Sequence, residues 1–302
     1  MKKTLIIIAG PTAVGKTALS IDLAKFYKCP VISADSRQFF KEMSIGTAKP
    51  TTEEMQGVPH YFIDHISIHD TYNVGQYERD VIETIESLFE NHDILILVGG
   101  SGLYINAVLN GVDEFEEIPS EIRDQIIRDY NEKGLSFLQN ELKKRDEVYY
   151  HQVDLNNPQR VMRALEVCVH TQQPYSSFRK KEKKERSFNT INLLINTGRE
   201  ALYERINKRV EVMMEQGLPE EVKSLYPQKH LNALNTVGYK ELFDFIDGKQ
   251  SLEEAVHMIK QNTRRFAKRQ LTWFNNQGEF EPFEPTELEK IKAYIDILSQ
   301  HL

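Results

Sequence analysis

The stretch Gly10-Pro-Thr-Ala-Val-Gly-Lys-Thr17 decides the fold class of this 302-residue chain. It follows an apolar run from Leu5 to Ala9, which we expect to be a strand, and it opens a helical pattern, so it matches G-x-x-x-x-G-K-[ST] in the right structural context. Backbone N–H groups of such a loop wrap a diphosphate, and the helix N-terminus adds partial positive charge. The predicted diphosphate-binding residues are Gly10, Pro11, Thr12, Ala13, Val14, Gly15, Lys16 and Thr17.

Two side chains of this loop carry further chemistry. Lys16 supplies a point charge to the phosphates, and the Thr17 hydroxyl can hold Mg²⁺. We therefore expect Mg²⁺ as the cofactor and Thr17 as the protein ligand. The motif by itself does not specify the phosphate compound or the bond that breaks.

Outward from the loop, short apolar strands alternate with helical patterns. The expected strands are 5–9, 31–34 and 94–98, and the expected helices begin near Gly15 and span 74–91. This rhythm predicts an α/β fold, with a P-loop NTPase-like parallel sheet flanked by helices.

A long helical region interrupts the strands. A polar break at 110–119 precedes a helical pattern over 120–142, and Asn157-Pro158 is typical of a helix start. The next strand pattern is 191–195. We expect a catalytic core formed by 1–112 and 190–302, with an all-helical insertion domain at 113–189.

The composition is that of an ordinary globular protein, with 40% hydrophobic and 27% charged residues. No apolar run approaches the roughly 18 residues of a membrane span, so we expect no membrane association. Two cysteines, Cys29 and Cys168, cannot form a disulfide framework, and the first residues lack the pattern of a signal peptide. The expected location is the cytoplasm.

Charge is segregated along the chain, although the net charge is −7. Residues 113–132 contain eight acidic side chains, whereas 256–275 contain five basic and no acidic ones. Residues 179–186 form another basic block. A local basic surface can attract a polyanion despite the negative total.

Two more polar clusters follow expected strands: Asp35-Ser-Arg-Gln38 and Gly99-Gly-Ser-Gly-Leu-Tyr104. Ligands of open parallel sheets lie at the carboxyl ends of the strands, so both clusters should meet the phosphate loop. Asp93 precedes its strand, which leaves Asp35 as the carboxylate beside the loop. Two chemistries stay open: phosphoryl transfer to a hydroxyl with Asp35 as base, or departure of a diphosphate from carbon with Asp35 serving an incoming nitrogen.

These motifs resemble, in order and spacing, those of bacterial tRNA dimethylallyltransferases. The residues that carry the resemblance are 10–17, 34–36 with Gln38, 45–50, 99–104, Asp154 with 157–160, 163–166, 237–241 and 263–273. The chain departs in having Phe40 where the family often has Tyr, Ser101 where it often has Thr, and no zinc finger of the eukaryotic type.

The resemblance implies transfer of a dimethylallyl group from dimethylallyl diphosphate to N6 of the adenosine immediately 3′ of the tRNA anticodon, with release of diphosphate. The implied catalytic residues are Asp35, Ser101 and Lys16. The implied partners are the tRNA anticodon stem-loop, which the insertion domain would contact, and dimethylallyl diphosphate; we expect a monomer with no stable protein partner. The implied tRNA-binding residues are Asp35, Ser36, Arg37, Gln38, Ser101, Arg123, Gln159, Arg160, Val161, Met162 and Arg163.

Helical spacing places Arg160 and Arg163 on one face, where they can meet phosphates or unstacked bases. The alternative is a solvated face that pairs with Glu166. The basic helix at 256–275 also suits RNA, but we expect its aromatic residues Phe266, Trp273 and Phe274 in the core.

Two other functions remain in competition. A P-loop small-molecule kinase would use the early motifs with ATP, and an RNA-binding protein would use a nucleotide only as a switch. A zinc site at His60, His65 and His69 is not favoured, because the spacing lacks the H-E-x-x-H pattern.

Overall fold

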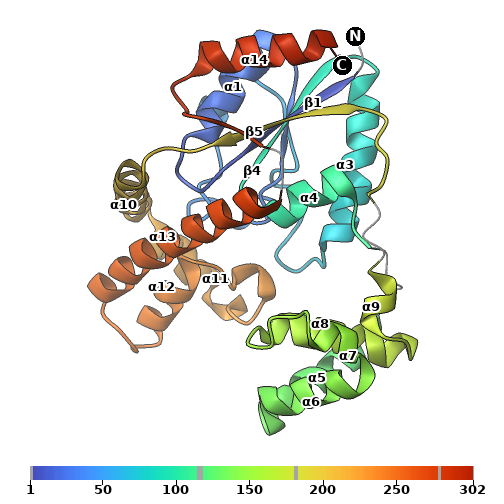
Figure 1. Ribbon diagram of the computed structural model, residues 1–302. Coiled ribbons are helices and arrows are strands. Elements are labelled where there is room, and N and C mark those ends of the chain that lie inside the picture. Colours follow the sequence, from blue (N-terminus) through green and yellow to red (C-terminus); the bar gives the residue numbers. More distant parts are fainter. Residues whose placement is uncertain (1–2, 114–117, 180–182, 278–279, 302) are drawn as a thin grey trace. The chain divides into compact units, whose positions relative to one another are not determined.

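A computed structural model of the chain describes residues 3–113, 118–179, 183–277 and 280–301. The chain divides into two compact units (Figure 1). The core unit comprises residues up to Asn110 together with those from Glu185 onward, and the helical unit comprises Gly111–Lys184.

The core unit is built on a six-stranded sheet whose paired strands are all parallel, as predicted. The strand order is β3-β2-β4-β1-β5-β6. The strands are β1 (Thr4–Ala9), β2 (Val31–Ser33), β3 (His60–Tyr61), β4 (Ile94–Gly99), β5 (Asn189–Ile195) and β6 (Glu281–Phe283). The edge strands β3 and β6 were not predicted, because two or three partly exposed residues give no apolar alternation.

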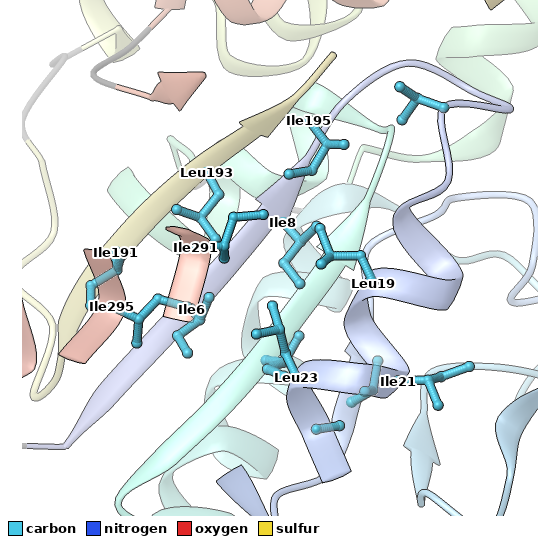
Figure 2. Packing of buried hydrophobic residues seen from close by; sticks show 14 of the residues in the cluster. Ile6, Ile8, Leu19, Ile21, Leu23, Ile191, Leu193, Ile195, Ile291 and Ile295 are labelled. Carbon is cyan, nitrogen blue, oxygen red and sulfur yellow. The ribbon is translucent and has the colours of Figure 1, made fainter. Parts of the chain in front are cut away.

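Helices cover both faces of this sheet. Alternate residues of β1 point to opposite faces. Ile6 and Ile8 pack with Leu19 of α1 (Lys16–Tyr27) and with Ile291 of α14 (Leu288–His301), as Figure 2 shows. The opposite face packs with α3 (Val74–Phe89) and α4 (Gly102–Asn110). Burial on both faces explains why β1 is a continuous apolar run.

The helices after β5 form a further hydrophobic cluster within the core unit. They are α10 (Arg199–Glu215), α11 (Leu218–Leu225), α12 (Tyr239–Ile246) and α13 (Leu252–Gln277), with 3₁₀ turns at Tyr226–Gln228 and Asn232–Leu234. Residues 39–55, which include the short helix α2 (Thr52–Met55), connect to this cluster through Phe40 and Met43. The cluster therefore joins the segment after β2 to the C-terminal helices.

In the helical unit the described residues form helices and no strands. The helices are α5 (Ser120–Lys133), α6 (Leu135–Arg145), α7 (Glu147–Tyr150), α8 (Pro158–Thr171) and α9 (Tyr175–Phe178). The single helix expected over 120–142 was wrong: Gly134, with φ 78° and ψ 175°, separates α5 from α6. At the start of α8, Asn157 Oδ1 accepts the Arg160 N–H at 3.2 Å, as expected for an N-cap.

The boundaries between the compact units differ slightly from those of the predicted domains. The predicted core ends at residue 112 and resumes at residue 190. Residues from Glu185 belong to the core unit. Arg186 forms an ion pair with Glu78 of α3 at 2.8 Å and donates to the carbonyl oxygens of Ala107 and Val108. These buried contacts fix the chain to the core before β5 begins at Asn189.

Within the described part of the chain, no helix combines the length and apolar composition needed to cross a membrane.

Candidate active site

The phosphate loop connects the end of β1 to α1, and its glycines are required by its geometry. A Cβ on Gly10 would lie 2.4 Å from the Ile195 carbonyl oxygen of the neighbouring strand β5. Gly15 has φ 109°, a conformation that side-chain-bearing residues rarely adopt. The loop can therefore follow the sheet edge closely and present its backbone to a ligand.

Lys16 lies against this loop. Its Nζ donates to the carbonyl oxygens of Gly10 at 2.9 Å and Pro11 at 2.7 Å. Burial lowers the pKa of Lys16 to about 7; the negative charge of Asp35 opposes this shift and the positive charge of Arg209 reinforces it. The loop thus holds a lysine whose charged form is disfavoured by burial.

Two arginines of α10 extend the positive charge around the loop. Arg205 donates to the Val14 carbonyl oxygen at 2.9 Å, and Arg209 donates to Thr12 Oγ1 at 3.3 Å. Burial lowers the pKa of Arg209, while Asp35 acts in the opposite direction. The sequence analysis missed both residues, which lie about 190 positions from the loop that they contact.

The structure brings together the polar clusters that follow β2 and β4, as predicted. The Ser36 N–H donates to Ser101 Oγ at 3.1 Å, and the Ser101 hydroxyl lies 3.2 Å from Ser36 Oγ. Asp35 Oδ1 accepts the Arg37 N–H at 3.0 Å, which fixes the carboxylate in a turn. Asp35 and Ser101 consequently face one region.

Neighbouring contacts hold the rest of this cluster. The Arg37 guanidinium donates to the carbonyl oxygens of Asn232 and Ala233. Gln38 Nε2 donates to the carbonyl oxygens of Thr47 and Ala48 at 3.2 and 3.1 Å. These two predicted tRNA-binding side chains thus use hydrogen bonds to position backbone segments of the core unit.

A carboxylate from α11 organises the turn that Gln38 contacts. Glu221 accepts the backbone N–H groups of Ser44, Ile45 and Gly46 at 2.8–3.0 Å, and it accepts the Tyr239 hydroxyl at 2.6 Å. A Cβ on Gly46 would lie 2.5 Å from the Tyr239 ring. This packing accounts for the glycine in the Ile45–Pro50 motif, which sequence reasoning left without a role.

Two adjoining cavities of about 710 and 590 Å³ meet at Asp35. The larger contains the phosphate loop with Arg205 and Arg209. The smaller is lined by Ser101 and by several residues of α13. Residues common to both are Thr12, Asp35, Gly100, Arg209, Met213, Phe266 and Gln270.

The aromatic residues of α13 only partly follow the prediction. Phe274 is buried in the core, as expected. Phe266 is 39% exposed, and it lines both cavities. Trp273 packs on the core but also lines the smaller cavity. The prediction of a core position was therefore wrong for Phe266 and incomplete for Trp273, because this face of α13 borders the site.

The residues of the larger cavity fit a divalent cation that arrives with a diphosphate. Thr17 and Asp35, which carry a hydroxyl and a carboxylate, both line that cavity. Within the described ranges, no group of three His, Cys, Asp or Glu side chains is arranged to hold a metal, and this includes the histidines at 60, 65 and 69. Mg²⁺ commonly takes one or two protein ligands together with phosphate oxygens and water.

The predicted tRNA-binding residues on α8 of the helical unit fall into an exposed group and a buried group. Gln159, Arg160 and Arg163 are exposed on α8, whereas Val161 and Met162 are buried in the unit's own core. The side chains of the last two pack within the unit itself, and their assignment as RNA contacts stays a prediction. Glu166 accepts from Arg163 at 3.0 Å and pairs with Arg123 at 3.8 Å, which is the pairing that the solvated-face alternative describes.

A phosphate loop, a nearby carboxylate and two arginines at the carboxyl edge of a parallel sheet define a P-loop α/β protein with an anion site. The family model described as IPP transferase matches residues 38–277, which is most of the chain. The chain belongs to the IPP transferase family, and the predictions of the family and of an enzyme are confirmed.

Relatives of known name are similar over nearly the whole chain. A tRNA dimethylallyltransferase of Christiangramia forsetii is 52% identical over 297 residues, with 98% of each chain covered. A tRNA dimethylallyltransferase of Flavobacterium johnsoniae is 50% identical over 300 residues, with 97% of each chain covered.

Solved structures of named transferases are also similar to this chain. The tRNA isopentenylpyrophosphate transferase of Bacillus halodurans has a TM-score of 0.72 and 36% identity, covering 98% of this chain and 96% of that one. A eukaryotic dimethylallyltransferase acting on tRNA has a TM-score of 0.82 and 27% identity, and the match covers 99% of this chain and 80% of that one.

Proposed function

We propose that this chain transfers a dimethylallyl group from dimethylallyl diphosphate to N6 of the adenosine immediately 3′ of the tRNA anticodon and releases diphosphate. The observation that carries the proposal is the position of Asp35, at the meeting point of a cavity lined by the phosphate loop and a cavity lined by Ser101. One carboxylate thus faces the place of a leaving diphosphate and the place of an incoming base.

The phosphate side is suited to the departure of a charged group. Breaking the allylic C–O bond leaves both bonding electrons on the diphosphate, and this charge must be stabilised as it develops. Backbone N–H groups of the loop, Lys16 and Arg209 supply positive potential there. Thr17 is the residue that would hold Mg²⁺, which would neutralise further charge on the diphosphate.

The base side is suited to a poor nucleophile. The adenine N6 lone pair is delocalised into the ring, and forming the new N–C bond requires loss of one N6 proton. Asp35 accepts that N–H and takes the proton as the bond forms. Ser101, whose hydroxyl faces Ser36 beside Asp35, orients the amine.

The base must leave its stack to reach this position, because N6 lies on the Watson–Crick edge. Phe266 and Trp273 line the smaller cavity and offer faces on which a purine can stack. Exposed Gln159, Arg160 and Arg163 of the helical unit, together with Arg123, are proposed to contact the anticodon stem-loop. The proposed location is the cytoplasm, and the proposed state is a monomer.

The kinase alternative is not favoured by the relatives named above or by the strand ends. In P-loop NTPases an Asp at the end of a later strand organises Mg²⁺. Here β4 ends at Gly99, and Asp93 precedes it and pairs with Lys3 at 2.9 Å.

The test is incubation of the protein with Mg²⁺, unmodified tRNA and labelled dimethylallyl diphosphate. We expect label in tRNA, at N6 of the adenosine following the anticodon after nuclease digestion. A matched tRNA with guanosine at that position should remain unlabelled. Absence of label, together with ATP-dependent phosphorylation of a small molecule, would contradict the proposal.

A further inference from the structure

Gln270 of α13 connects two loops of the site through a buried amide that is 8% exposed. Its Oε1 accepts the Thr12 N–H at 2.9 Å, and its Nε2 donates to the Gly100 carbonyl oxygen at 2.8 Å. Thr12 belongs to the phosphate loop after β1, and Gly100 belongs to the loop after β4 that carries Ser101. One side chain thus spans the two strand ends.

The chemistry of this link suits an amide. A side chain at this position must accept from one loop and donate to the other. An ionised carboxylate only accepts, and an ammonium group only donates. Glutamine meets both needs without adding charge beside an anion site.

The surrounding backbone is shaped to admit this amide. A Cβ on Gly100 would lie 2.3 Å from Gln270 Nε2, so the glycine leaves the space that the amide occupies. One helical turn further on, the Trp273 ring lies in the same relation to Gly102, whose Cβ would be 2.3 Å away. Two glycines of one loop therefore make room for two side chains of α13.

We propose that Gln270 is a positioning residue, which fixes the phosphate loop relative to Ser101 and so aligns the leaving diphosphate with the incoming amine. This inference rests on the proposed function and assigns to α13 a part in its geometry. Gln270, Thr12 and Gly100 all border both cavities, so the link lies where the two substrates would meet.

Loss of the link should affect turnover more than tRNA binding. Misplacing reacting groups by about 1 Å can cost about 100-fold in rate. In Gln270→Met, which keeps the length and removes both hydrogen bonds, we expect kcat to fall by about 10- to 100-fold. The tRNA Kd should change by less than about threefold, because the exposed cations are untouched.

The control is Asn262→Leu on the same helix. Asn262 Nδ2 donates to Glu241 at 2.7 Å and does not border either cavity, so this variant removes an amide contact of α13 without touching the two loops. Its kcat should stay within about threefold of wild type at a comparable change in Tm.

Gly100→Ala should break the same link at its other partner, since its new Cβ must displace the Gln270 amide. The double variant Gly100→Ala, Gln270→Met should lose little more turnover than either single variant, because both remove one interaction. Hydrogen exchange supplies a readout independent of activity: the Thr12 amide should exchange at least about tenfold faster in Gln270→Met than in wild type or Asn262→Leu.

Three results would overturn the inference: unchanged exchange at Thr12, kcat of Gln270→Met within threefold of wild type, or losses that multiply in the double variant. A wild type that transfers no prenyl group would contradict the proposed function instead. In that case the exchange comparison alone would decide whether the link exists.

Discussion

The core unit and the helical unit hold their candidate functional residues in different ways. In the core unit, Asp35, Ser101 and Gln270 form hydrogen bonds with the loops that follow the strands. In the helical unit, Arg123 and Arg163 pair with Glu166 of the same unit, and their own side chains are 58% and 46% exposed. The hydrogen bonds of the core unit fix the positions of its site residues. The exposure of the arginines in the helical unit leaves their charges accessible to a partner in solvent.

This difference has a functional consequence. Chemistry depends on the placement of reacting groups, whereas binding to a phosphate backbone depends on charge that can adapt in position. Substitutions in the core unit should therefore change turnover, and substitutions on α8 should change tRNA affinity. The two kinds of effect should be separable in one set of assays.

The largest expected effect is that of Asp35→Asn, which keeps the shape of the side chain and removes its ability to take a proton. We expect kcat to fall by at least about 100-fold. The Kd for tRNA should stay within about threefold, because Asp35 carries no positive charge for the RNA. Single-turnover prenylation and a binding titration measure the two quantities.

Turnover of Asp35→Asn near the wild-type rate would remove this residue from the chemistry. A loss of tRNA affinity equal to the loss of turnover would break the contrast between the units.

A smaller effect is expected for Arg163→Ala in the helical unit. The variant should lower tRNA affinity by about three- to tenfold at moderate salt and flatten the slope of log K against log salt by about one unit. Turnover at saturating tRNA should stay within about twofold. The control is Lys144→Ala in the same unit, whose exposed ammonium pairs with Glu141. An unchanged slope would leave Arg163 with the structural role of pairing with the buried carboxylate of Glu166.

The sequence was sufficient for those parts of the fold that follow from local pattern. The phosphate loop has a glycine spacing that only one strand-loop-helix geometry satisfies, and the start of α8 has an asparagine followed by proline. The break between α5 and α6 was missed because the apolar spacing continues across Gly134. That glycine was the available signal.

Contacts between distant segments could not be predicted from such patterns. Arg209 and Gln270 reach the phosphate loop from 197 and 258 residues away. For Gln270 a signal exists: it shares a helical face with Ala267 and Phe274, both buried, and a polar residue on an apolar face calls for a partner. The partner itself could be named only from the structure.

The smallest expected effect, and the most specific to the core unit, is proton uptake by Lys16 on binding of dimethylallyl diphosphate. Burial lowers the pKa of Lys16 to about 7, whereas a bound diphosphate favours the charged amine and raises that pKa. Binding should therefore take up protons, with a larger uptake at pH 8 than at pH 6.

Because the complex holds the extra proton, affinity should weaken as pH rises above 7. Calorimetric titrations in buffers of different ionisation enthalpy measure the uptake. Lys16→Arg is the control, because an arginine stays charged across this range and should show only the titration of the diphosphate itself. Equal uptake by both proteins would mean that Lys16 is already charged in the free protein, and its hydrogen bonds to Gly10 and Pro11 would then hold an ammonium ready for the ligand.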